Sequence, residues 1–136
     1  MNINEFWLKK SKLVFWDKEP SFSFKKKNNN YVDWYPNGKI NIYYNCVTKN
    51  IESGLGDKVA IHTINKAKKF NKYTYKDLDN KVKYFSKVLE SRLKNKDLSK
   101  CKILIYSSAS IESAVSMLSC AKLGIHFAVL FEDLAS

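Results

Sequence analysis

Arginine is almost absent from this 136-residue chain, although the chain is strongly basic. Arg92 is the only arginine among 24 basic residues, and the lysines are scattered along the whole length, for a formal net charge of +11. A surface evolved to bind phosphate groups concentrates its cations and favours arginine for bidentate contacts. Scattered lysine, together with abundant asparagine, isoleucine and tyrosine, instead indicates a coding bias towards A and T. The composition therefore argues against nucleic acid as a partner.

Cysteine, glycine and long apolar runs are also scarce. Cys46, Cys101 and Cys120 are odd in number and far apart, which predicts free thiols and neither a disulfide framework nor a zinc site. No apolar stretch approaches the roughly 20 residues needed to cross a bilayer, and the N-terminus lacks the layout of a secretory signal. We therefore expect a cytoplasmic protein with no membrane partner.

With four glycines, the sequence offers no glycine-rich phosphate loop. The stretch GLGDK at residues 54–58 lacks the strand before it and the helix after it that such a loop needs, so it predicts a turn. The run KKKNNN at residues 25–30 predicts a solvated loop, because asparagine favours turns.

Two regions differ in their patterning. Residues 1–56 are irregular and rich in aromatic side chains among polar and turn residues, as in a segment that folds by anchoring on another surface. From residue 57 the periodicity becomes regular, with strands predicted at 57–75 as a pair, at 102–107 and at 127–131, and helices at 75–94 and 110–123. We expect the last two strands to be parallel neighbours buried on both faces, which defines an α/β fold.

Local signals mark the helix ends. Thr74 is placed to cap the first helix with Asp77 three residues later, and acid-first pairs four residues apart, such as Asp79 and Lys83, favour a solvated face. Ser110 is placed to cap the second helix, which Gly124 ends.

No spacing in the chain supports self-contained chemistry. Ser107 and Ser108 follow a strand but lack the G-x-S-x-G elbow of a nucleophile, so capping explains this serine-rich segment better. His62 has no acid or thiol at ligand spacing, and His126 lies at a helix-to-strand junction, so both are expected to be structural, hydrogen-bonded residues. We predict no catalytic residue and no metal ligand.

The stretch VDWYPNGKINIYYNCV resembles the N-terminal signature of short-chain acyl-CoA synthetases, the acetyl- and propionyl-CoA synthetase branch of the AMP-dependent, adenylate-forming superfamily. The matching residues, in the family's order, are Trp34, Tyr35, Gly38, Ile40, Asn41, Tyr44 and Asn45. The Phe6–Trp7 pair and Trp16 match the leading aromatics of that family, and GDKVAI, YTYKDL and the segment from residue 103 to 131 continue the pattern collinearly.

The resemblance implies the N-terminal fragment of a ligase that joins a carboxylate such as acetate or propionate to CoA, with ATP and Mg²⁺. Residues 1–56 would be the family's N-terminal cap segment, and residues 57–136 would be the first strand–helix–strand units of its AMP-binding large domain, truncated. The family's phosphate loop, adenylate pocket and catalytic lysine lie beyond the point that matches Ser136. The chain alone is therefore expected to be inactive and to use no cofactor.

One departure from the family pattern concerns CoA. The family has Phe-Gly-Gly near the CoA nucleotide, and the matching residues here are Phe131, Glu132 and Asp133. Two carboxylates would repel a polyanion and prevent the close approach that glycine permits.

Two interpretations remain open from the sequence. In the first, the chain is a gene remnant, a split subunit or a truncated piece of a synthetase, and its partner is the remaining part of the enzyme as a separate chain, or a second copy of itself. In the second, it is a stand-alone basic α/β module that binds nucleic acid or another protein.

Overall fold

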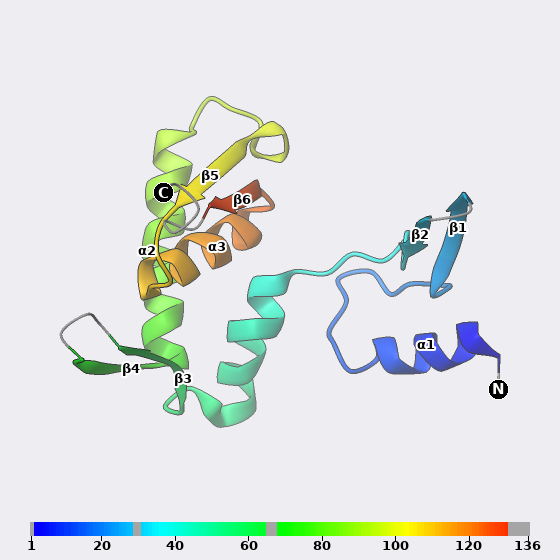
Figure 1. Ribbon diagram of the computed structural model, residues 1–136, viewed down its shortest axis with the longest axis horizontal. Helices are drawn as coiled ribbons and strands as arrows, with labels where there is room; N and C mark the ends of the chain where they lie inside the picture. Colours follow the sequence, from blue (N-terminus) through cyan, green and yellow to red (C-terminus); the bar gives the residue numbers. More distant parts are fainter. Residues whose placement is uncertain (1, 29–30, 65–67, 131–136) are drawn as a thin grey trace. The chain divides into compact units, whose positions relative to one another are not determined.

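The structure, a computed structural model, describes residues 2–28, 31–64 and 68–130 (Figure 1). The chain forms two compact units, residues 1–41 and 42–136. Both contain helix and strand, as expected for the predicted α/β class, and the sheets are small. No helix in the described ranges is long and apolar enough to cross a bilayer. The assignment of residues 1–56 and 57–136 to two regions of the resembling family is a separate statement and stays a prediction.

The N-terminal unit contains helix α1 (Ile3–Ser11) and a hairpin of strands β1 (Phe24–Asn28) and β2 (Tyr31–Trp34). The Asn2 side chain caps α1 by accepting a hydrogen bond from the Asn4 backbone at 3.0 Å. The two strands are antiparallel. Residues 1–56 were predicted to be irregular, and these elements show that this prediction was wrong.

The lysine run also differs from its prediction. Lys25, Lys26 and Lys27 lie in β1 and are solvent-exposed, so their exposure was predicted correctly but their strand conformation was not. The Lys27 ammonium lies 3.0 Å from the Asp33 carboxylate on the paired strand. Opposite charges on neighbouring strands favour pairing that the local sequence does not reveal.

Aromatic rings hold the N-terminal unit together. The Trp7 and Trp34 rings meet edge to face with their centres 5.3 Å apart. The ring centres of Phe24 and Trp34 are 5.6 Å apart, and those of Trp16 and Tyr35 are 5.2 Å apart. Such pairs add stability beyond the area that they bury. They explain why this segment is so rich in aromatic residues.

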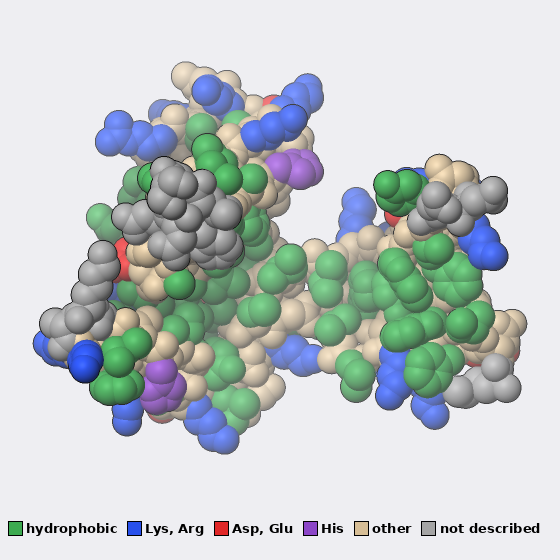
Figure 2. Space-filling model, viewed as in Figure 1, with side chains coloured by type: hydrophobic (Ala, Val, Ile, Leu, Met, Phe, Trp, Pro, Cys, Tyr) green, Lys and Arg blue, Asp and Glu red, His purple; other side chains and the backbone are tan. Residues whose placement is uncertain are grey.

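No apolar side chain in the described part of this unit is buried; its buried residues are Ser11 and Ser23. Ser23 donates hydrogen bonds from its backbone and its hydroxyl to the Asn4 side-chain oxygen, at 2.8 and 2.6 Å. Figure 2 shows hydrophobic side chains gathered on the surface of this unit, on the right of the view. The described part of this unit therefore consists of partly exposed aromatic side chains in contact with one another, without a buried apolar core.

The second unit starts with helical residues 42–55, followed by the antiparallel hairpin β3 (Val59–Ile64) and β4 (Phe70–Thr74). Helix α2 (Tyr75–Arg92) and a short turn of helix at Leu98–Lys100 come next. Strand β5 (Lys102–Tyr106), helix α3 (Ile111–Leu123) and strand β6 (His126–Leu130) complete the described chain. The elements predicted from residue 57 onward are thus confirmed.

The predicted caps are confirmed as well. The Thr74 hydroxyl accepts from the Asp77 backbone at 3.1 Å, and the Asp77 carboxylate accepts from the Thr74 backbone at 2.9 Å, which is a capping box. Ser110 accepts from the Ser113 backbone at 3.2 Å, and Gly124 ends α3 with φ +69°. A left-handed φ at this position is easily adopted only by glycine.

The core of this unit is formed by three helical segments. Tyr43 and Val47 from residues 42–55 pack with α2 and α3, and the buried cluster consists of Tyr43, Val47, Leu78, Val82, Ile111 and Val115. Leu78 and Val82, four residues apart on α2, are both buried and form an apolar stripe on the side of the helix that faces this core.

Strands β5 and β6 are parallel and in register from Lys102 opposite His126 to Tyr106 opposite Leu130. This confirms the predicted strand–helix–strand unit, in which α3 packs on both strands. The prediction that both faces of these strands are buried was wrong: Ile105 is buried, but Leu104 and Tyr106 are exposed. No described residue covers the second face.

Candidate functional site

The carboxyl ends of β5 and β6 form the position where open α/β sheets usually bind ligands. The Ser107 backbone donates to the Leu130 carbonyl at 3.3 Å, which joins the two strand ends. The Ser107 hydroxyl donates to the Ser108 carbonyl at 3.0 Å, and Ser110 caps α3. The predicted capping role of Ser110 is confirmed, and Ser107 bonds its local backbone.

The residues predicted to face CoA, Phe131, Glu132 and Asp133, lie outside the described residues. They follow Leu130 directly in the sequence, after the last residue of β6. Their assignment stays a prediction.

A buried polar network lies beside the core of the second unit. The Tyr43 hydroxyl donates to the buried Asp79 carboxylate, whose other oxygen lies 2.7 Å from the Lys83 ammonium. Burial, and next the hydrogen bond to Asp79, raise the pKa of Tyr43 to about 12. The Lys122 ammonium lies 5.6 Å from the centre of the Tyr43 ring. The network fixes residues 42–55 on α2 and places a cation from α3 against the same ring.

The predicted Asp79–Lys83 pair therefore exists, but Asp79 is buried and not on a solvated face. A neutral tyrosine with a raised pKa is a poor general base near pH 7, and the lysine beside Asp79 keeps that carboxylate paired. The arrangement stabilises structure and offers no reactive group.

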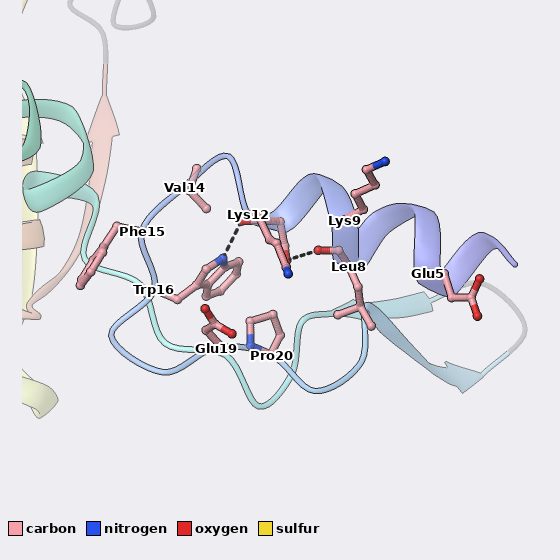
Figure 3. Close-up of a pocket in the computed structure, with 10 residues that line it drawn as sticks. Glu5, Leu8, Lys9, Lys12, Val14, Phe15, Trp16, Glu19 and Pro20 are labelled. Atoms are coloured by element: carbon pink, nitrogen blue, oxygen red, sulfur yellow. Dashed lines mark hydrogen bonds between the residues drawn. The ribbon is translucent and has the colours of Figure 1, made fainter. Parts of the chain in front are cut away.

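A surface cavity of about 590 Å³ lies in the N-terminal unit (Figure 3). Leu8 and Pro20 line it beside the Trp16 ring, whereas the Lys9 side chain points away from that ring. The Trp16 ring nitrogen donates to the Ser11 carbonyl at 2.8 Å, so its only hydrogen-bond donor is already used. The remaining lining mixes apolar side chains with four charged ones, Glu5, Lys9, Lys12 and Glu19, and these charges are of both signs.

Gly38 is required for the position of the Trp16 ring. A Cβ atom on Gly38 would lie 2.6 Å from the nearest ring carbon, closer than atoms can pack. The sequence resemblance included both residues, and the structure explains why they occur together.

No group of three or more metal-ligating side chains exists among residues 2–28, 31–64 and 68–130. His62 and His126 are exposed on β3 and β6, so the prediction that they are hydrogen-bonded structural residues finds no support in their environment. Cys120 is buried, and burial raises the pKa of its thiol.

The structure thus defines an α/β protein with a parallel strand–helix–strand unit, and a solved structure shares this fold. It is titled "Crystal structure of CmiS6" and aligns with a TM-score of 0.58 at 18% identity, over 67% of this chain and 21% of that one. At this identity the likeness concerns the fold alone.

Sequence comparisons are more specific. Residues 1–46 match the family described as "Acetyl-coenzyme A synthetase N-terminus". The chain is 32% identical to the acetyl-coenzyme A synthetase of Streptomyces coelicolor over 132 residues, which cover 96% of this chain and 20% of the relative. It is 36% identical to that of Bdellovibrio bacteriovorus over 128 residues, covering 92% of this chain and 18% of the relative.

These matches confirm the resemblance found in the sequence. The chain is related to the acyl-CoA synthetases over nearly its whole length and matches their N-terminal region. It spans about a fifth of the length of the curated relatives that it matches.

Proposed function

We propose that this chain is the N-terminal part of an ATP-dependent acyl-CoA synthetase. The complete enzyme would convert a carboxylate of the acetate or propionate type, ATP and CoA to acyl-CoA, AMP and pyrophosphate. The collinear relationship to acetyl-coenzyme A synthetases over 96% of this chain carries the proposal. The parallel β5–α3–β6 unit, a typical part of a nucleotide-binding α/β domain, supports it.

In this proposal residues 1–56 are the family's N-terminal segment and residues 57–136 begin its AMP-binding domain. The family match at residues 1–46 supports the first assignment. The specific arrangement of the adenylate-forming large domain, like the cytoplasmic location, is part of the proposal.

Adenylation depends on positioning ATP phosphates, Mg²⁺ and the carboxylate with oriented donors and cations. The 136 residues contain no glycine-rich phosphate loop, and lysines scattered along the sequence cannot replace one, because each is a separate point charge. The chain alone is therefore inactive, and its contribution is structural. It supplies strands β5 and β6, and β6 in sequence directly precedes the residues assigned to CoA.

Two assays test this function. The purified chain should show no ATP–pyrophosphate exchange with acetate, propionate or butyrate above a heat-treated control. A chimera in which this chain replaces the matching N-terminal fifth of the Streptomyces coelicolor enzyme should show acetate-dependent exchange, and the same enzyme with that fifth deleted should not. Exchange by the 136-residue chain itself, or an inactive chimera that is correctly folded, would contradict the proposal.

The same chimera tests the residues after β6. Replacing Glu132 and Asp133 by glycine should lower the KM for CoA and leave exchange unchanged, because CoA is not a substrate of the exchange reaction. Replacing Asp17 and Glu19, which are exposed and distant in sequence, by glycine removes the same two charges; it is the matched control and should not change the KM for CoA.

A further inference from the structure

Residues 92–102, from the last residue of α2 to the first residue of β5, are strongly basic. They carry five cations and one acid, and the cations are Arg92, Lys94, Lys96, Lys100 and Lys102. All five are solvent-exposed. Figure 2 shows lysine and arginine side chains gathered at the top of the second unit, where Figure 1 places this segment. Like charges held this close together repel one another, so an anion would stabilise the segment.

The one acid of the segment is already engaged. Asp97 accepts hydrogen bonds from the Ser99 backbone and hydroxyl at 3.1 and 2.7 Å, and its other oxygen lies 3.5 Å from the Lys100 ammonium. The other four cations of the segment form no ion pair with any residue that the structure describes. Their charges are therefore not balanced within the described ranges.

Three of the lysines surround a cavity. Lys96, Lys100 and Lys102 line a surface cavity of about 460 Å³, to which the engaged acid also contributes. Leu93 and Ile103 form an apolar part of its wall. A cleft with a surplus of one sign of charge and low-dielectric walls concentrates the electrostatic potential. The cavity therefore attracts an anion more strongly than the same lysines would on a flat surface.

The cavity lies at the amino ends of the parallel strands. Lys102 is the first residue of β5, and its register partner His126 is the first residue of β6. The residues assigned to CoA follow Leu130, at the other end of β6. The function proposed above gives the basic cavity no role.

We propose that this cavity binds a small soluble anion with two or three linked phosphate groups. Lysine binds phosphate as a compact point charge with three donors. The three lysines occupy separate positions around the cavity, so linked phosphate groups can contact more of them than a single phosphate can. The concave shape fits a small anion better than it fits a flat lipid surface or an extended nucleic-acid strand. This inference goes beyond the proposed function, and its test does not use the exchange assay.

Isothermal titration calorimetry on the 136-residue chain tests the site, with inorganic pyrophosphate and tripolyphosphate as probes. Both should bind about fivefold more tightly than inorganic phosphate at the same ionic strength. Lys96→Gln and Lys102→Gln should each weaken pyrophosphate binding about fivefold, because each removes a charge from the cavity. Lys94→Gln is the matched control: Lys94 is exposed in the same segment but does not line the cavity, so the affinity should change less than about twofold.

A substitution of the acid should act in the opposite direction. Asp97 lines the cavity, and Asp97→Asn removes its negative charge while keeping a side-chain oxygen that can accept from the Ser99 backbone. Pyrophosphate binding should therefore become about twofold tighter. Circular dichroism establishes that all four variants remain folded.

Equal weakening by Lys94→Gln and the two lining variants would show that pyrophosphate responds only to the overall positive charge, and would overturn the inference. Absence of binding, or binding no tighter than that of inorganic phosphate, would also overturn it. Vesicles of phosphatidylcholine and phosphatidylserine and a single-stranded oligodeoxynucleotide test the larger alternatives. If either binds more tightly than pyrophosphate, and only the lining variants weaken that binding, the occupant is a membrane surface or a nucleic acid and the inference is wrong.

Discussion

The two units of this chain are stabilised by different kinds of side-chain contact. In residues 42–136, Val47 and Val82 are fully buried among side chains from three helical segments. In the described part of residues 1–41, the buried residues are two serines, and the aromatic rings contact one another while remaining partly exposed. Helices and strands alone therefore do not make a self-sufficient domain.

The difference has an energetic meaning. Buried apolar area is the dominant favourable contribution to folding, and a unit of about 40 residues buries too little of it to be stable alone. Edge-to-face aromatic pairs contribute on the order of 1 kcal/mol each. We therefore expect the second unit to dominate the unfolding transition and the first to respond locally.

The largest expected effect is on the core of the second unit. Leu78→Ala should lower the free energy of unfolding by about 3 kcal/mol, because it removes a buried side chain and leaves a cavity. Urea unfolding followed by circular dichroism measures the change. Tyr84→Ala on the same helix is exposed and should cost less than about 0.5 kcal/mol. Equal effects of the two substitutions would show that α2 does not bury the stripe described here.

The second effect concerns the polar network. Tyr43→Phe should cost about 2 kcal/mol, because the buried Asp79 carboxylate loses a hydrogen bond. Since the folded pKa of Tyr43 is raised from 10.0 to about 12, its contribution is full below pH 10 and lost as the pH rises towards 12.

Urea unfolding at pH 8 and pH 11.5 tests both statements about Tyr43. The difference between wild type and Tyr43→Phe should shrink at the higher pH. Tyr44→Phe removes a hydroxyl that bonds the exposed Glu52, and it is the control for the size of the effect at pH 8. A difference that is constant with pH would contradict the assigned titration.

A smaller effect is expected in the N-terminal unit. Gly38→Ala should displace the Trp16 ring, because the new methyl group would overlap it, at a cost of about 1 kcal/mol. Tryptophan fluorescence should shift while the main unfolding transition keeps its midpoint. At Gly54→Ala, by contrast, the new methyl group meets no atom within 4 Å, but the φ of +80° strains the backbone, so this change should affect the second unit instead. If Gly38→Ala moved the main transition, the two units would be energetically coupled.

The smallest effect concerns the exposed cap of α2. Hydrogen bonds from the Thr74 backbone, and next from its hydroxyl, lower the pKa of Asp77 below 3.8. The stabilisation is therefore full above pH 3.8 and lost as the pH falls through the lower folded value. Asp77→Asn should melt at a lower temperature than wild type at pH 7 and at nearly the same temperature near pH 2. A gap that persists at pH 2 would refute this account of the cap.

The sequence predicted the second unit well wherever the signals are local. Thr74, Ser110 and Gly124 mark helix ends through their own chemistry, and the period of the apolar residues defines α2. The helix at residues 42–55 was missed, because its tyrosines, asparagines and β-branched residues are poor helix formers. It exists because Tyr43 and Val47 pack on α2, which is tertiary information.

The candidate site was predicted less completely. The bond between Tyr43 and Asp79 joins residues 36 positions apart, and no local pattern encodes that pairing. One signal was available: Asp79 directly follows Leu78 on the edge of the apolar stripe, where a carboxylate needs a partner. The exposure of Leu104 and Tyr106 on β5 was unexpected, because an apolar run such as Ile103 to Tyr106 is typical of a strand buried on both faces.

The wide separation of the core residues along the sequence also affects how the protein folds during synthesis. Tyr43 and Val47 meet Ile111 and Val115, so the N-terminal end of the cluster closes against its C-terminal end. On the ribosome, α2 can form early from local contacts, but the cluster cannot close until α3 has emerged. Residues 42–55 therefore stay uncovered in the nascent chain until α3 has left the ribosome. During this interval, chaperone binding to residues 42–55 would protect it most.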